Sequence, residues 1–475
     1  MARISSHPVG PAPTAPERET MRHRSIRAFA TFLLFSALGH AIWYNLLGYI
    51  GTLILMSLLI AGTLGIWVPR LVRSRREAAF PWRRLPWVAL GYLAYAIASV
   101  FWSGWPEATL VTWAAQFAFT IAALFIADTL SWRELARALE VALRWIMGLS
   151  VVIELWVAAV LRHPLLPDFS DAPANPDPHW YWVRGNLFTG FLTGDRIQGV
   201  VGNSNQLGFL SLIALFVFAL QLADRRTRPL TGWLWLVVTG YLFIRAESAT
   251  AIVSGLVTLV ALAAALLLRR ASRAEARTKL YALFGGVIVA GVIFAVLARE
   301  ELFALLGRKD TLTGRTRIWQ AVWERAITHP VFGNGFSSPW VPWDKAFDGW
   351  IIDHGTTVFH AHDMWLDVFM QLGVVGVVLL AAAYLSLLWR SWFFAVDRPR
   401  WDLRDDRPFQ ALTLLPLLVV VSALTRGLAE SSPIMLWGWM ILVMLTFKIK
   451  SAPLVGHDET RQVAPDLREL QLRSG

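Results

Sequence analysis

Apolar runs of about 20 residues recur along almost the whole chain, and each could cross the hydrocarbon core of a bilayer as a helix. Of the 475 residues, 56% are hydrophobic and only 16% are charged. A soluble chain of this length would divide into about two or three domains. Inside a membrane, backbone groups are satisfied only within helices or closed barrels. The sequence therefore predicts an all-α fold, a polytopic membrane helix bundle that forms one domain.

These runs predict about twelve transmembrane spans. The first run, 28–68, is too long for one span, and we expect a hairpin that is broken near 45–48. The layout gives a cytoplasmic N-terminal tail at 1–27, a transmembrane domain at 28–447 and a cytoplasmic C-terminal tail at 448–475. The other spans are expected at 86–102, 108–127, 138–161, 206–223, 230–245, 250–268, 280–298, 364–389, 409–425 and 434–447.

The basic residues divide unevenly between the two sides of this layout. The predicted inner segments hold 31 of the 44 Lys and Arg residues, the outer segments hold 11, and Arg144 and Arg245 lie within spans. An excess of Lys and Arg in cytoplasmic loops is the positive-inside pattern, so both termini are expected inside. This pattern explains the net charge of +11 and excludes nucleic acid as a partner. We expect a multi-pass protein of the cytoplasmic (inner) membrane, with membrane lipids around it.

Two large outer loops are expected, at 162–205 and 299–363. The second lies between the predicted spans nine and ten and carries most of the outer basic residues, together with His354, His360 and His362. Loops of this length without a fold of their own are uncommon and usually functional. The loop 299–363 is therefore the candidate active site, facing outside.

A helix is predicted within this loop, from about 313 to 330. Apolar residues at Ile318, Val322 and Ile327 give it an amphipathic pattern, typical of a helix that lies near the membrane interface. The fold prediction thus includes a large helical outer loop.

Arg315 and Arg317, at the start of this helix, and Arg196, in a glycine-rich turn, are candidate anion-binding residues. A guanidinium group binds phosphate oxygens through two parallel hydrogen bonds, and backbone N–H groups at a helix start add to the field. If Arg196 and Arg315 share a face, they would clamp a multiply charged anion. The alternative is that the arginines of the helix extend to lipid headgroups and that Arg196 lies at the surface.

His362 is the candidate general base, because a neutral imidazole above bound phosphate suits proton removal from a hydroxyl. It begins the run to Gly373 and Gly376, glycines that allow a neighbouring helix to approach closely. A structural histidine is the alternative. Zinc bound by His360 and His362 is a third interpretation, for which the neighbouring aspartates Asp353, Asp363 and Asp367 would have to complete the site. The chain has no cysteine, and we expect neither a metal nor a cofactor.

Charged residues inside the spans are expensive and suggest a function by default. Arg144 and Glu154 lie in the predicted span five, about 15 Å apart along a helix, so they cannot pair directly. Arg245 and Glu247 lie by the turn between spans seven and eight. We interpret these four as packing groups in the interior of the bundle.

Taken together, these stretches resemble the superfamily of O-antigen ligases and polymerases, bacterial membrane enzymes that act on lipid-linked glycans. The likeness is firmest from about 313 to 376 and extends to Arg196 and Glu430. The matching residues are Arg196 before Gly199 and Asn205, the run Gly314-Arg315…Trp319…His329-Pro330…Gly333-x-Gly335, and the run from His362 to Gly373-x-x-Gly376.

The resemblance implies a twelve-span bundle whose large outer loop covers a site for an undecaprenyl-diphosphate-linked donor. It implies that Arg196 and Arg315 grip the diphosphate and that His362 activates the acceptor hydroxyl without a metal. The family ligases usually have Asn, Ser or Gln after that histidine, whereas this chain has Asp363. The remaining candidates for substrate binding are Arg317, Asn205, His360 and Glu430.

The predicted function is a metal-independent, inverting glycan transferase with a lipid-linked oligosaccharide donor and a glycan or glycolipid acceptor. Ligase and polymerase share this chemistry and differ in the acceptor. A transporter or flippase of lipid-linked saccharides is the alternative from another class, and it would need charged residues at the midplane of the bundle. A scaffold of a secretion complex is a third possibility, in which Arg196, Arg315 and His362 would be replaceable.

The charge asymmetry predicts the topology, which reporter fusions can measure. Fusions at Ser74, Ala271 and Asp405 are expected to report the cytoplasmic side, and fusions at Ser170 and Lys345 the outer side. A cytoplasmic signal at Lys345 would contradict the assignment of the active site, because its loop could not meet an exported substrate.

Overall fold

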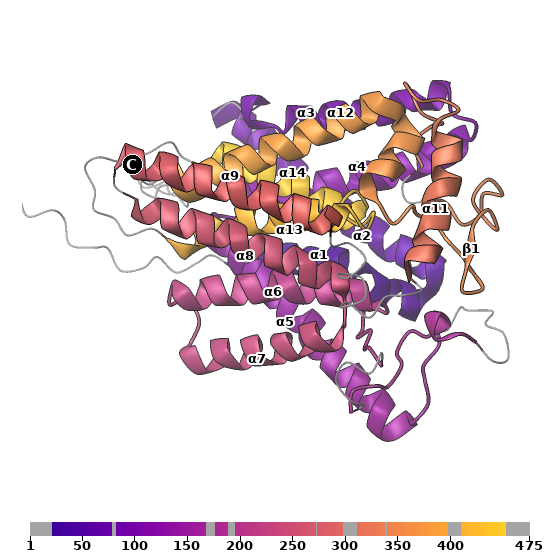
Figure 1. Ribbon diagram of the computed structural model, residues 1–475, viewed down its shortest axis with the longest axis horizontal. Coiled ribbons are helices and arrows are strands. Elements are labelled where there is room, and N and C mark those ends of the chain that lie inside the picture. The colour runs from indigo at the N-terminus through magenta and orange to yellow at the C-terminus, as the bar shows by residue number, and fades with distance from the viewer. Residues whose placement is uncertain are drawn as a thin grey trace, which may run out of the picture.

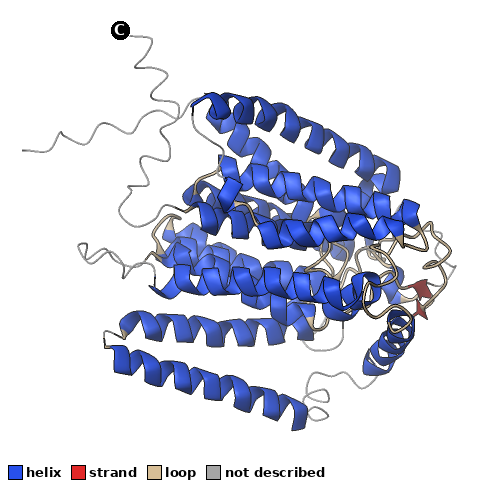
Figure 2. Ribbon diagram, turned by 90° about the horizontal axis from the view of Figure 1, so that it is seen from above, coloured by secondary structure: helices blue, strands red, loops and turns tan. Residues whose placement is uncertain are grey.

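The computed structural model describes residues 21–77, 82–167, 176–188, 195–271, 273–297, 311–337, 340–397 and 410–452. In this part of the chain, long helices run side by side in one bundle, and irregular loops gather at one end together with helix α11 and a two-stranded hairpin (Figure 1, Figure 2). Most of the two predicted tails, 1–20 and 453–475, lies outside the described residues. The first described helix begins at Met21 and the last ends at Ser451, so the described parts of the predicted tails 1–27 and 448–475 are mostly helical.

The α-helices and strands follow in this order: α1 (Met21–Leu38), α2 (His40–Glu77), α3 (Trp87–Ala98), α4 (Pro106–Thr129), α5 (Trp132–Trp156), α6 (Ser204–Ala223), α7 (Pro229–Arg245), α8 (Ala249–Arg270), α9 (Ala274–Leu297), α11 (Thr311–Ala326), β1 (Ile352–Asp353), β2 (Thr356–Thr357), α12 (Met364–Trp392), α13 (Leu415–Gly427) and α14 (Leu436–Ser451). Short helical turns are η1 (Trp82–Arg84), η2 (Ser99–Phe101), η3 (Val157–Leu161), η4 (Pro178–Trp180), η5 (Phe393–Asp397) and η7 (Ala411–Leu414).

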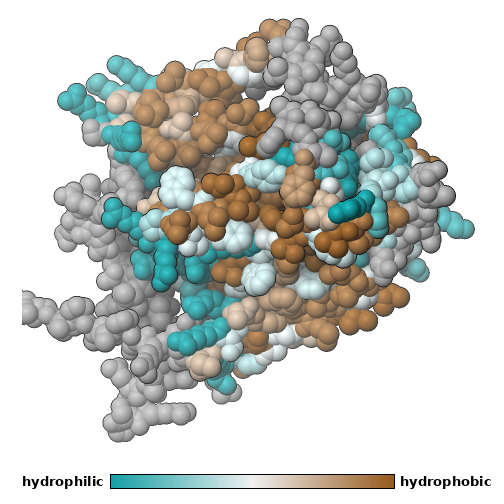
Figure 3. All heavy atoms as spheres, turned by 90° about the horizontal axis from the view of Figure 1, so that it is seen from below, coloured by the Kyte–Doolittle hydropathy of each residue, from teal (hydrophilic) through white to brown (hydrophobic). Residues whose placement is uncertain are grey.

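Every predicted span overlaps an apolar helix, which confirms a polytopic helical membrane protein. Six described helices are long and apolar enough to cross a membrane by length and composition, and two shorter apolar helices accompany them. Figure 3 shows a band of hydrophobic side chains across one face, with hydrophilic residues toward its two ends. Such a band is what a bilayer would contact.

Several boundaries and interruptions differ from the prediction. Helix α5 begins at Trp132 rather than at 138, because Ser131 and Glu134 form a capping box in which each side chain accepts a hydrogen bond from the backbone N–H of the other. The first hairpin has two interruptions instead of one. The helix breaks between α1 and α2 at Gly39, and α2 bends at Gly48, where φ is 66°.

The helix predicted in the long outer loop is α11, which ends at Ala326 instead of near 330. Its Ile318 and Val322 are buried in a small apolar cluster with Trp340 and Phe347 of the following loop, whereas Ile327 is half exposed. The apolar face of α11 therefore packs on protein, and the loop has a core of its own at this end of the bundle.

Helix α12 is interrupted at Gly373, where φ is 62° and ψ is −164°. The segment 330–335 fills the gap through backbone hydrogen bonds, from Gly335 N to Gln371 O (2.9 Å) and from Val374 N to Pro330 O (2.9 Å). A Cβ atom on Gly373 would lie 2.3 Å from the carbonyl oxygen of Val331. The prediction that this glycine admits a neighbouring helix was wrong, because it admits a loop.

Replacing Gly373 with Ala is expected to destabilise the protein. These backbone angles are almost exclusive to glycine, so a side chain there costs about 1–3 kcal/mol, and the close contact with Val331 adds to this. Gly240→Ala is the control, since Gly240 lies within a helix with open space beside it. Thermal unfolding in detergent should show a melting temperature several degrees lower for Gly373→Ala only. An unchanged melting temperature for Gly373→Ala would mean that the interruption is not needed.

Candidate functional site

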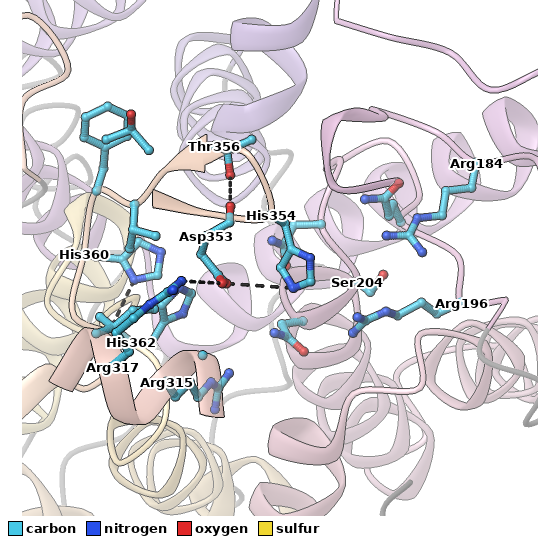
Figure 4. Close-up of a pocket in the computed structure, with 18 residues that line it drawn as sticks. Arg184, Arg196, Ser204, Arg315, Arg317, Asp353, His354, Thr356, His360 and His362 are labelled. Atoms are coloured by element: carbon cyan, nitrogen blue, oxygen red, sulfur yellow. Dashed lines mark hydrogen bonds and ion pairs between the residues drawn. The ribbon is translucent and has the colours of Figure 1, made fainter. Parts of the chain in front are cut away.

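A cavity of about 620 Å³ opens at the loop-covered end of the bundle. Its walls come from the loop before α6, the first turns of α6 and α11, and the segment 353–362 (Figure 4). Because N–H groups at helix starts carry partial positive charge, these turns favour an anion. Six of the seven predicted site residues line this cavity: Arg196, Asn205, Arg315, Arg317, His360 and His362. Arg184, Asp353 and His354, which were not predicted site residues, line it as well.

Glu430 joins the predicted site residues to one another. Its carboxylate accepts hydrogen bonds from Asn205 Nδ2 (2.9 Å) and Arg315 (3.1 Å), and its second oxygen lies 3.5 Å from His362 Nδ1. These partners stand at the first turn of α6, in α11 and directly before α12, while Glu430 follows α13. One buried carboxylate therefore connects four separate parts of the chain.

Arg426 lies beside the cluster of residues around Glu430 and was not among the predicted site residues. Its guanidinium donates to Asn205 O (2.8 Å) and Ser432 Oγ (2.6 Å) and lies 4.6 Å from the centre of the Phe209 ring. Arg426 is fully buried. Its spacing of four residues from Glu430, at the end of a predicted span, is a signal that could have found the pair.

Two opposing influences set the charge state of Glu430. Burial works to raise the pKa of its carboxyl, but the hydrogen bond and charge of His362 and the charges of Arg426 and Arg315 hold that pKa well below its usual range. Glu430 is therefore a carboxylate at neutral pH, facing the imidazole of His362.

His360 and His362 have different environments. Burial, and then the charge of His362, lowers the pKa of His360 to about 3, so its ring is neutral. His360 Nδ1 accepts a hydrogen bond from the backbone N–H of His362 (3.2 Å), and it supports the left-handed backbone of His362, whose φ is 53°. A non-glycine residue in this conformation is uncommon and is held by its surroundings.

The nearby aspartates serve the fold. Asp363 caps α12, since its Oδ1 accepts from the backbone N–H groups of Trp365 (2.8 Å) and Leu366 (2.9 Å). Burial raises the pKa of the Asp363 carboxyl, although these two hydrogen bonds work against it. Asp367 accepts from Trp340 Nε1 (2.8 Å). The carboxylate beside His362 is therefore Glu430 and not Asp363.

A possible metal-binding group does emerge, with a third member that the sequence did not indicate. Ligand atoms of His360, His362 and Glu430 lie within 4.8 Å of one another. Two histidines and a carboxylate are a ligand set that zinc accepts. In this arrangement, however, Glu430 already accepts hydrogen bonds from Asn205 and Arg315. The absence of a metal thus stays a prediction.

The loop that carries Arg196 is held from inside the bundle. Glu154 of α5 accepts from the backbone N–H groups of Gln198 (2.9 Å) and Gly199 (2.8 Å). Arg245 of α7 donates to Asp195 O (3.1 Å) and accepts from Ile197 N at its own backbone oxygen (3.0 Å). Two of the charges predicted to be packing groups therefore fix the position of Arg196. Arg144 lies elsewhere on α5 and pairs with Glu140.

Arg317 has a peripheral place. Its side chain is 64% exposed, donates to Ile352 O (2.9 Å) and lies 3.5 Å from the carboxylate of Asp353. Arg315, two residues earlier, points instead to Glu430. The two arginines at the start of α11 thus occupy the rim and the interior of one cavity.

Two comparisons relate the sequence of this chain to known proteins. Residues 234–381 match a family model described as O-antigen ligase, a range that contains Arg315 and His362 but not Arg196 or Glu430. The chain is also 24% identical, over 371 residues, to the exopolysaccharide production protein ExoQ of Rhizobium meliloti (strain 1021), with 74% of this chain and 73% of the relative covered. Together with the motifs, these similarities support a resemblance of the chain to the O-antigen ligase superfamily.

Proposed function

We propose that the chain transfers a glycan from a lipid-diphosphate-linked donor to an acceptor hydroxyl, with His362 as the general base. The observation that carries this proposal is the contact between His362 and Glu430 in a cavity lined by four arginines. An anionic donor suits the arginines and the helix starts. The histidine supplies the proton acceptor that an attacking hydroxyl needs.

The reaction divides among few groups. A proton on His362 Nδ1, facing Glu430, leaves the Nε2 lone pair free to take the proton of the acceptor hydroxyl. The acceptor oxygen then attacks the anomeric carbon on the face opposite the diphosphate, and the bond from that carbon to the phosphate oxygen breaks. The configuration inverts, and the lipid diphosphate leaves with the bonding electrons.

Arginines replace a metal ion in this scheme. Preorganised positive groups stabilise charge that develops on a leaving group, and Arg196 and Arg315 line the same cavity. Burial, and to a smaller extent the charge of Arg315, lowers the pKa of Arg196. Its guanidinium nevertheless stays charged at neutral pH because its ordinary pKa is so high.

The membrane setting follows from the same proposal. A donor held by a polyprenyl chain is presented at the membrane surface. The loops and helix α11 that supply residues to the cavity gather at one end of the bundle (Figure 2). This position favours a transferase over a transporter with a midplane site. We place the cavity at the outer face of the cytoplasmic membrane, with both termini inside, in the production of a surface or extracellular polysaccharide. Ligase and polymerase remain equivalent here, because both need the same groups.

Glycan transfer by the purified protein from a lipid-diphosphate donor tests this function. His362→Ala is expected to remove about 10²–10⁴-fold of the rate, as for the loss of a general base, while the protein still binds the donor. His360→Ala is the matched control, and it should reduce the rate only partly, because His360 supports the backbone. The assay is run in excess EDTA, where the wild-type rate should persist. Full activity of His362→Ala would contradict the mechanism, and a rate that Mg²⁺ alone restores would contradict metal independence.

Glu430→Gln is expected to lower the maximal rate of transfer. The carboxylate lies 3.5 Å from His362 Nδ1, where it favours the ring tautomer with its proton on that nitrogen and a free lone pair on Nε2. A neutral glutamine loses the negative charge that holds the ring in this form. Asp363→Asn is the control, because an asparagine also caps a helix, and its rate should stay close to that of the wild type. A rate of Glu430→Gln identical to that of the wild type would show that Glu430 does not act on His362.

A further inference from the structure

The positive charges of the cavity differ in how far they are balanced. Arg315 and the buried Arg426 share the carboxylate of Glu430, and Arg317 lies beside Asp353. Each of these three arginines therefore has a negative neighbour that belongs to the protein.

Arg184 and Arg196 have no such neighbour. Among the described residues, no carboxylate lies within ion-pair distance of either guanidinium. Asp177, Glu154 and Asp195 act on Arg184 from farther away, and Glu247 acts on Arg196. Arg184 Nε is buried without a hydrogen-bond acceptor. A buried donor without an acceptor is rare in proteins and calls for an explanation.

These two arginines also face each other's charge. Burial, and next the charge of Arg196, lowers the pKa of Arg184. Figure 4 shows their side chains on the same side of the cavity, across from His360 and His362. Two like charges in a partly buried place repel each other. An anion between them would offset this repulsion and supply the acceptor that Arg184 Nε lacks.

The chain holds this pair in place with structural contacts. Trp182 and Val183, directly before Arg184, form backbone hydrogen bonds with Leu165, and Trp182 Nε1 donates to Val200 O (3.0 Å). The segment of Arg184 is thereby fastened to the loop of Arg196. A rigid fork of two guanidinium groups can offer several parallel hydrogen bonds to phosphate oxygens.

We propose that Arg184 and Arg196 form an anion-binding pair that takes a phosphate group of the donor, next to Arg315, which also binds Glu430. The pair rests on the proposed function for the identity of the anion, since a lipid diphosphate is the multiply charged group that the reaction brings to this cavity. Arg184 thus becomes a substrate-binding residue, although neither the motifs nor the family range 234–381 includes it.

Binding of inorganic diphosphate to the purified full-length protein in detergent, with EDTA present, tests the pair without any transfer step. Arg184→Gln should raise the dissociation constant about 10- to 100-fold, the usual effect of losing hydrogen bonds to a charged group. Arg270→Gln is the matched control, an exposed arginine at the C-terminal end of α8 that does not line the cavity, and it should bind nearly as the wild type does. If Arg184→Gln fails to fold, Arg184→Lys replaces it and should still bind several-fold more weakly, because lysine lacks the planar fork.

The inference is wrong if the wild type does not bind diphosphate or if Arg184→Gln or Arg184→Lys binds it with unchanged affinity. It is also wrong if Arg270→Gln loses as much affinity, because a diffuse positive field would then explain binding. The proposed function fails separately. A protein that binds diphosphate through Arg184 but does not transfer glycans would retain the pair and refute the transferase, and the reverse result would refute only the pair.

Discussion

The site depends on one buried negative charge, the carboxylate of Glu430. A buried charge is tolerated only when partners compensate for its lost hydration, and here Asn205, Arg315 and His362 converge on it from three other parts of the chain. The same requirement applies in reverse, because without Glu430 two arginines would remain in a confined space without their counter-charge. The contacts of Glu430 therefore hold the four chain segments together and also position the residues of the site.

A second constraint fixes where the imidazole lies. The interruption of α12 at Gly373 lets the segment 330–335 bind the helix backbone directly, which joins α11 and its loop to α12. Helix α12 then begins at the Asp363 cap, with His362 immediately before it. Non-helical backbone within an apolar helix needs polar partners from protein, and this loop supplies them. The glycines of the motif thus build the scaffold that carries the candidate base.

The sequence was sufficient to predict the membrane bundle and to select most of the residues that the structure brings together at the cavity. Apolar length sets the spans, and the polar loop between them identified Arg315 and His362 by contrast with their apolar surroundings. The central place of Glu430 could not be predicted, because its partners lie 115 and 225 residues away and no periodicity relates them. For the same reason the roles of Glu154 and Arg245 were missed. The conformations of Gly373 and Gly333 depend on a loop-to-helix contact that a pattern of apolar residues does not encode.

The most direct measurement is an electron-density or cryo-electron-microscopy map of the full chain with a lipid-diphosphate-linked glycan bound to the inactive His362→Ala protein. The account predicts the diphosphate among the arginines of the cavity and the anomeric carbon on the side of residue 362, within reach of a hydroxyl placed there. Density for the diphosphate at the middle of the bundle, away from Arg196 and Arg315, would contradict it and would support a transporter.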